Sequence, residues 1–119
     1  MLPRELLAEA KEIVARQGAG EAAYRAATHA AYYALYHLMC DYFSLDPSKR
    51  DEASHADIMR RLDQLDIPSA KPHATKARAK YRSLWRLRRQ ADYFFNDPYD
   101  DTQAELAIGY ADDVFNLYP

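Results

Sequence analysis

Apolar residues recur at helical spacing along this whole chain, and glycine or proline interrupts the pattern at only a few points. No stretch alternates apolar and polar residues for long enough to predict a β-strand. The breaks fall at Gly18-Ala19-Gly20, at Pro47, between Pro68 and Pro72, and at Asn96-Asp97-Pro98. We therefore expect five helices, at about residues 3–16, 21–43, from near Asp51, 74–95, and from a cap at Asp100 or Asp101 to about Leu117.

Helical segments joined by short loops predict an all-α fold, an antiparallel bundle of four to five helices. A length of 119 residues is enough to close one hydrophobic core, so we expect a single domain over residues 1–119. The chain has no apolar run long enough for a membrane span, and its N-terminus lacks an apolar signal core. We therefore expect a cytoplasmic protein that does not contact a membrane.

The single cysteine and the few glycines exclude several kinds of site. Cys40 has no second cysteine with which to form a disulfide or a zinc knuckle, and we expect it to be a buried structural thiol. Only three glycines are present, so phosphate-binding loops of the Walker or dinucleotide type are absent. We expect no cofactor.

The net charge of −2 hides a strong asymmetry along the chain. Residues 71–89 contain eight lysines and arginines and no acid, whereas residues 90–119 contain seven acids and no lysine or arginine. If these segments form adjacent antiparallel helices, their charges would largely neutralise each other. Alternatively, the basic strip stays available to bind phosphate.

Four chemically useful side chains of the second predicted helix are spaced four residues apart: Arg25, His29, Tyr33 and His37. This spacing stacks them along one slowly drifting face, where they could bind phosphate or move protons near neutral pH. Alternatively, Tyr33 packs in the core while the histidines make buried hydrogen bonds or lie at an interface. The two histidines are about 12 Å apart along the helix, too far to share a metal ion, so we expect no metal site.

Arg88 falls on the inward stripe of the fourth predicted helix. Its companions on that stripe are Tyr81, Leu84, Ala91 and Phe95. An arginine at the edge of a core needs an anion or several acceptors, and Asp92 lies one turn further on. The pair could simply fix the register of the helix, or Arg88 could point into a groove between the second and fourth helices, ready for a nucleotide phosphate.

Two segments together resemble the small prokaryotic HEPN domains. Tyr32-Tyr33-Ala34-Leu35-Tyr36-His37 is similar to the YYAxFH signature of that family, and Leu87-Arg88-Arg89-Gln90-Ala91-Asp92-Tyr93 is similar to its LRxxADY signature. His55 falls where relatives often carry a histidine, and the last helix has an acidic start, as in the family. The resemblance covers about residues 5–116.

The resemblance implies a helical bundle that forms a homodimer by pairing its two long helices. The family includes metal-independent ribonucleases and toxins, and partners of small nucleotidyltransferases, often in toxin–antitoxin pairs. Active members carry an arginine followed four to six residues later by histidine on the last long helix. Here Arg88 matches the arginine but Tyr93 follows instead of histidine, and His29-Ala30 stands where relatives often show Ser-Arg. The chain therefore resembles a member with a degenerate ribonuclease motif.

Our first functional hypothesis is a HEPN-like dimeric module that binds RNA, a nucleotide or a nucleotidyltransferase partner. The residues that we expect to bind are Arg25, Tyr33, Arg88, Arg89 and Asp92.

The alternative is a metal-independent ribonuclease, in which Arg88 steadies the phosphate and Tyr93, His29 or His37 replaces the missing histidine. A third hypothesis is a structural or regulatory dimer with no role in nucleic-acid binding. The string from Arg50 to His55 also has an arginine and a histidine at the family spacing, but it precedes the third helix, and we interpret it as a chance match.

Overall fold

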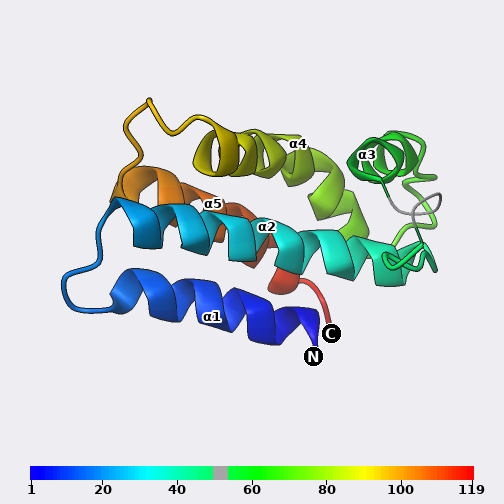
Figure 1. Ribbon diagram of the computed structural model, residues 1–119. Helices are drawn as coiled ribbons and strands as arrows, with labels where there is room; N and C mark the ends of the chain where they lie inside the picture. The colour runs from blue at the N-terminus through cyan, green and yellow to red at the C-terminus, as the bar shows by residue number, and fades with distance from the viewer. Residues whose placement is uncertain (50–53) are drawn as a thin grey trace.

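Each break in the apolar pattern separates two helices in the computed structural model, which describes residues 1–49 and 54–119 (Figure 1). The predicted all-α bundle is confirmed: the described residues contain five helices and no strand. The helices are α1 (Pro3–Ala15), α2 (Glu21–Tyr42), α3 (His55–Asp63), α4 (Pro72–Tyr93) and α5 (Asp101–Phe115).

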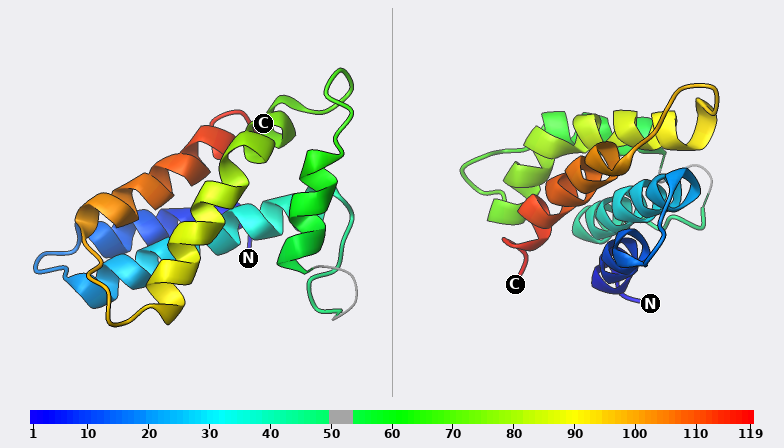
Figure 2. Two further views of the ribbon diagram at one scale, coloured as in Figure 1. Left: turned by 90° about the horizontal axis from the view of Figure 1, so that it is seen from above. Right: turned by 90° about the vertical axis from the view of Figure 1, so that its left-hand side faces the viewer.

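The long helix α2 lies at the centre of the bundle and packs against all four other helices. Its buried side includes Ala27, Ala31 and Ala34, and such small side chains let neighbouring helices approach closely. α1 runs antiparallel to α2 on one side, and α4 and α5 cover the other side (Figures 1 and 2). The short α3 lies beside α4 near the C-terminal end of α2 (Figure 2).

Side-chain caps explain where two of the helices begin. Asp100 is the N-cap of α5, as predicted, and its carboxylate accepts a hydrogen bond from the backbone N–H of Gln103. Ser54 caps α3 in the same way by accepting from the backbone N–H of Asp57. α3 therefore begins at His55, and the expected start near Asp51 lies outside the described residues.

Two expectations at the ends of α4 are wrong. We placed Pro72 in the preceding loop, but it opens the helix, because its fixed φ angle suits a first turn that needs no N–H from it. We placed Phe95 on the inward stripe, but α4 ends at Tyr93, so the helical spacing does not extend that far. Phe95 is 71% exposed.

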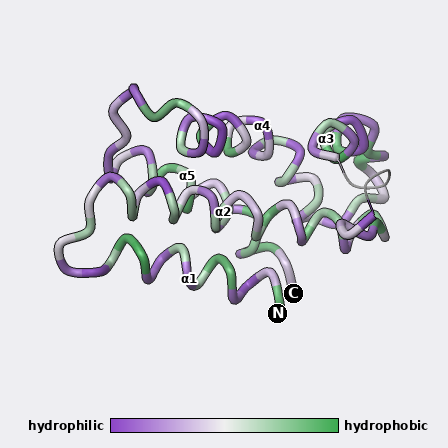
Figure 3. Tube along the Cα trace, in the orientation of Figure 1, coloured by the Kyte–Doolittle hydropathy of each residue, from purple (hydrophilic) through white to green (hydrophobic). Residues whose placement is uncertain are grey.

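The helices are amphipathic, and their apolar side chains form the interior. Polar residues interrupt the apolar ones along each helix (Figure 3), and Cys40 is buried, as expected. Within the described ranges, no helix combines the length and apolar character that crossing a bilayer requires.

The guanidinium of Arg4 donates a hydrogen bond to the carbonyl oxygen of Tyr118, and this contact joins α1 to the C-terminal segment.

Candidate functional site

Arg88 is buried on the face of α4 that packs against α2, and only 4% of it is exposed. Its guanidinium carbon lies 5.1 Å from the ring centre of Tyr32 and 5.7 Å from that of Tyr33. Its Nη1 is 3.6 Å from the Oδ2 atom of Asp92, one turn further along α4. The predicted contact with Asp92 and the orientation toward the second helix are therefore confirmed.

The hydrogen bonds of Arg88 are few and long. Nη1 donates to the hydroxyl of Tyr93 at 3.4 Å, and Nη2 donates to Nε2 of His55 at 3.3 Å. The Nε–H is buried and has no hydrogen-bond partner among the described residues. A buried guanidinium held in this way keeps donor capacity that an anion could use.

His55 links Arg88 to a chain of hydroxyl groups in the core. Because arginine can only donate, Nε2 of His55 must accept, which leaves the proton of a neutral ring on Nδ1. That nitrogen lies 2.5 Å from the hydroxyl of Tyr32, which in turn lies 2.8 Å from the hydroxyl of Tyr81. Burial and the charge of Arg88 both lower the pKa of His55, so this ring is neutral at pH 7.

A second histidine reaches the same place from α2. Nδ1 of His29 lies 2.9 Å from Oδ2 of Asp92, and the His29 side chain is 53% exposed. The ring of Tyr33 lies 4.6 Å from that of His29, and burial raises the pKa of the Tyr33 hydroxyl. Asp92 therefore lies between Arg88 on its own helix and His29 on α2.

Side chains from three helices thus meet at one place, which we call the Arg88 cluster. Its outermost member is Tyr93, which is 65% exposed and whose ring centre lies 5.6 Å from the Arg88 guanidinium. The cluster offers a cation, two imidazoles, a carboxylate and two phenols at the surface end of a buried hydrogen-bonded chain. Its members are His29 and Tyr33 of α2, His55 of α3, and Arg88, Asp92 and Tyr93 of α4.

Arg25 does not join the Arg88 cluster, although we expected it to bind nucleotide. Its Nη1 donates to the carbonyl oxygens of Gln90 and Ala91, both at 2.9 Å. Its Nη2 donates to those of Phe94 and Asp97, at 3.2 and 2.7 Å. Its Nε donates to Glu21 at 3.4 Å. All five N–H groups are committed, and Arg25 serves to cap the C-terminal end of α4.

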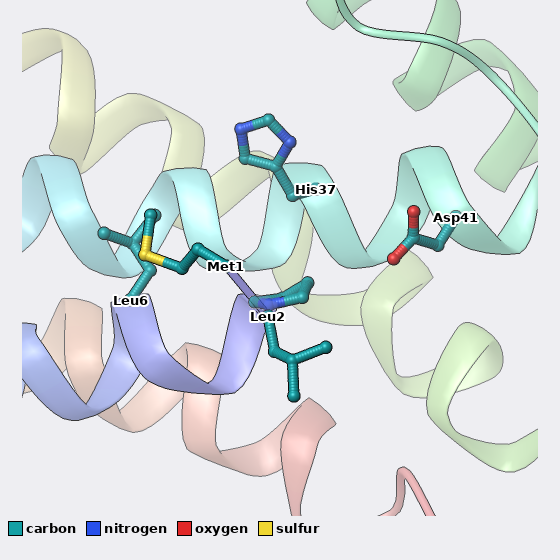
Figure 4. A pocket seen from close by; sticks show the side chains of 6 residues that line it. Met1, Leu2, Leu6, His37 and Asp41 are labelled. Atoms are coloured by element: carbon teal, nitrogen blue, oxygen red, sulfur yellow. The ribbon is translucent and has the colours of Figure 1, made fainter.

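His37 borders the Arg88 cluster through Tyr33, whose ring centre lies 6.4 Å from its own. Successive residues of a row spaced by four rotate about 40° around a helix, so the row from Arg25 to His37 diverges. His37 lines a surface pocket with Asp41 and the N-terminal residues of α1, and its imidazole points away from α1 (Figure 4). Of the four row members, His29 and Tyr33 belong to the cluster, His37 lies at its edge, and Arg25 does not join it.

The basic strip of residues 71–89 is neutralised only in part. Lys80 pairs with Asp113 of α5 at 3.5 Å, and Arg82 pairs with Asp63 of α3 at 3.0 Å. Arg89 is exposed and lies over the rings of Trp85 and Phe94, at 5.3 and 6.0 Å. Among the described residues, five cations of the strip form no ion pair with an acid: Lys71, Lys76, Arg78, Arg86 and Arg89. Neutralisation by the acidic last helix therefore holds for Lys80, and phosphate binding by the unpaired cations stays a prediction.

His55 and Tyr32 were absent from our set of expected site residues. The spacing of His55 from Ile58 and Leu62, by three and seven residues, places it on the buried side of α3, and this signal could have identified it. We considered His55 only as a position where relatives carry histidine and as the end of a string whose Arg50 lies outside the described residues.

Comparisons of the chain with protein-family models, with curated proteins and with solved structures each gave no match. The resemblance to HEPN domains therefore rests on the two sequence motifs and stays a prediction.

Proposed function

We propose that this chain is a HEPN-like binding module for single-stranded RNA or nucleotides, with the Arg88 cluster as its phosphate site. The observation that carries the proposal is the buried, incompletely hydrogen-bonded guanidinium of Arg88 beneath an exposed tyrosine. A cation with unused donors, next to a histidine and exposed aromatic rings, suits the phosphates and bases of RNA.

Binding would proceed from the exposed side of the Arg88 cluster. Displacement of the Tyr93 side chain opens the guanidinium of Arg88, and a phosphate then takes the place of the Asp92 carboxylate. His29 lies beside that carboxylate and would donate to the same phosphate. The unpaired cations Arg86 and Arg89 add a diffuse attraction to the RNA backbone.

The resemblance supplies the finer parts of the proposal. We include a homodimer formed through the long helices, a nucleotidyltransferase as a possible protein partner in a toxin–antitoxin pair, and a cytoplasmic location. Light scattering tests the dimer: a particle of the 13.7 kDa chain mass at micromolar concentration would contradict it.

Fluorescence anisotropy of labelled single-stranded RNA tests the phosphate site. Arg88→Ala should weaken RNA binding by about tenfold or more, because it removes a directed charged contact. Arg78→Ala removes an exposed charge from the same helix and should cost about twofold or less. Equal losses in both variants would show diffuse electrostatics and contradict a site at Arg88, and absence of RNA binding would contradict the RNA-binding function.

The second candidate function is a metal-independent ribonuclease, and the position of His55 favours it. His55 of α3 brings a neutral imidazole next to Arg88 of α4. On α4 itself, Tyr93 stands where active members of the family carry histidine. In such cleavage a base removes the proton of the 2′-hydroxyl, that oxygen attacks phosphorus, and an acid protonates the departing 5′-oxygen. RNA cleavage that persists in EDTA and is lost in both Arg88→Ala and His55→Ala would establish this function in place of simple binding.

A further inference from the structure

A second surface depression of about 470 Å³ lies where α3 packs against α4. We call it the α3–α4 pocket. It exists because the nine-residue α3 anchors itself through Ile58 and Leu62 and leaves its next face open along α4. The side chains that matter here are Met59, Arg60 and Asp63 of α3, and Arg82, Trp85 and Arg86 of α4.

An ion pair across the pocket fixes one of its walls. Asp63 accepts from both terminal nitrogens of Arg82, at 3.1 and 3.0 Å, and this contact lowers the pKa of the Asp63 carboxyl. Arg60 pairs with Asp57 at 3.1 Å. Arg86 has no acidic partner among the described residues, so it is the lining cation that is free for a ligand.

Trp85 gives the pocket an aromatic surface. Its indole is half-buried, and the guanidinium of Arg89 lies 5.3 Å from its ring centre. An indole ring is a good stacking surface for a nucleobase, and a guanidinium is a good partner for phosphate. Arg60 and Arg82 are paired with Asp57 and Asp63, so the unpaired positive charge of the lining is that of Arg86, and it favours an anionic ligand that carries a flat ring.

The pocket borders the Arg88 cluster. Ala56, which also lines the pocket, directly follows His55 on α3, and Trp85 precedes Arg88 by three residues on α4. A strand of RNA that contacts Arg88 would therefore pass close to the pocket.

We propose that the α3–α4 pocket binds a nucleoside monophosphate unit, with the base stacked on Trp85 and the phosphate held by Arg86. The unit is either a free nucleotide or one residue of a single-stranded RNA. For the RNA, the proposal deepens the function proposed above and rests on it; the free nucleotide needs only the pocket.

Trp85 is the only tryptophan of the chain, so its fluorescence reports directly on the pocket. We would titrate the protein with AMP and, separately, with single-stranded oligoadenylate. Both should quench the indole, since a base stacks on it in each case. Ribose 5-phosphate, which has the phosphate but no base, should leave the fluorescence unchanged. Stronger quenching by AMP than by oligoadenylate would identify the free nucleotide as the ligand.

A matched pair of variants distinguishes binding in the pocket from a general effect of positive charge on the helix. Arg86→Ala should weaken AMP binding by about tenfold, whereas Arg78→Ala, about two turns earlier on α4, should change it by about twofold or less. Circular dichroism confirms that both variants are folded. Trp85→Leu, followed by calorimetry, should lose AMP binding to the same extent as Arg86→Ala.

The outcomes distinguish the two proposals. Absence of quenching by AMP and by oligoadenylate overturns the pocket, and Arg88-dependent RNA binding would still support the phosphate site. AMP binding that depends on Arg86, in a protein whose RNA binding does not depend on Arg88, supports the pocket and overturns the phosphate site. Equal quenching by an acidic peptide would also overturn the pocket as a nucleotide site.

Discussion

Two buried arginines on the α2–α4 interface share the same side-chain chemistry but have opposite surroundings. Arg25 is 8% exposed and all five of its N–H groups donate, four of them to backbone carbonyls at the end of α4 and one to Glu21. Arg88 is 4% exposed and has two long hydrogen bonds, a distant carboxylate and an orphaned Nε–H.

The difference indicates how a structural arginine can be told from a binding one. Because every donor of Arg25 already has an acceptor within the fold, removing Arg25 takes a hydrogen bond from each of those acceptors. Incomplete pairing means that burying the guanidinium of Arg88 costs free energy of folding, and that a ligand that accepts the unpaired N–H would recover it. Substituting both arginines by methionine, which keeps the volume of the side chain, tests this comparison.

The largest effect that we expect is a loss of stability in the variant Arg25→Met. This change removes the guanidinium donor from four carbonyl oxygens, of which those of Gln90 and Phe94 keep a backbone N–H donor and those of Ala91 and Asp97 lose the contact described above, so the free energy of unfolding should fall by about 3 kcal/mol. Urea denaturation followed by circular dichroism measures it. A loss below about 1 kcal/mol would mean that water replaces the guanidinium and that Arg25 is not a structural cap.

Arg88→Met should show the reverse pattern. The free energy of unfolding should stay within about 1 kcal/mol of the wild type, because replacing a poorly paired buried ion by an apolar side chain is often neutral. RNA affinity, measured by anisotropy at fixed salt, should fall by about tenfold or more. A loss of stability equal to that of Arg25→Met would remove the distinction between the two arginines.

The sequence was sufficient for the helices and for the local partner of Arg88, because both depend on spacing along one helix. Glycine and proline positions predicted where one helix gives way to the next, although Pro72 opens α4, and the four-residue spacing predicted the contact with Asp92. Contacts between helices were not predictable in the same way. Every residue has a backbone carbonyl, so nothing in the sequence marks those of Gln90 and Ala91 as partners of Arg25.

His55 is a second case of a contact between helices that the sequence does not predict. Its helical spacing predicts burial, but the packing between helices decides which residue it meets. Only the packing of α3 against α4 brings its Nε2 to Arg88 and its Nδ1 to Tyr32. A sequence motif that places the histidine on the same helix as Arg88 cannot identify a histidine on another helix.

Acid should weaken the fold through His55. Burial and the charge of Arg88 lower the pKa of His55 in the folded protein, so in mild acid the unfolded chain binds a proton that the folded state resists. This contribution to stability is complete above about pH 6.5 and is lost as the pH falls toward the lowered pKa.

Urea unfolding at about pH 7 and about pH 5 measures this loss. His55→Gln, which keeps an acceptor for Arg88, should reduce the dependence on pH. Burial, followed by the charge of Lys71, also lowers the pKa of His73, so the double variant His55→Gln/His73→Gln should depend on pH less than either single variant. An unchanged dependence in His55→Gln would contradict a neutral imidazole at this half-buried position.

The smallest expected effect has the opposite sign and concerns Asp92. Its carboxylate lies 3.6 Å from Arg88 and 2.9 Å from His29, where it competes with any phosphate for both groups. Asp92→Asn keeps the shape but removes the repulsion, so RNA affinity should rise by about threefold. Asp113→Asn is the matched control, because Asp113 pairs with Lys80 away from the Arg88 cluster and should change affinity less. Weaker binding in Asp92→Asn would show that the carboxylate orients Arg88 for the ligand. Asp92 would then assist binding and would not compete with the phosphate.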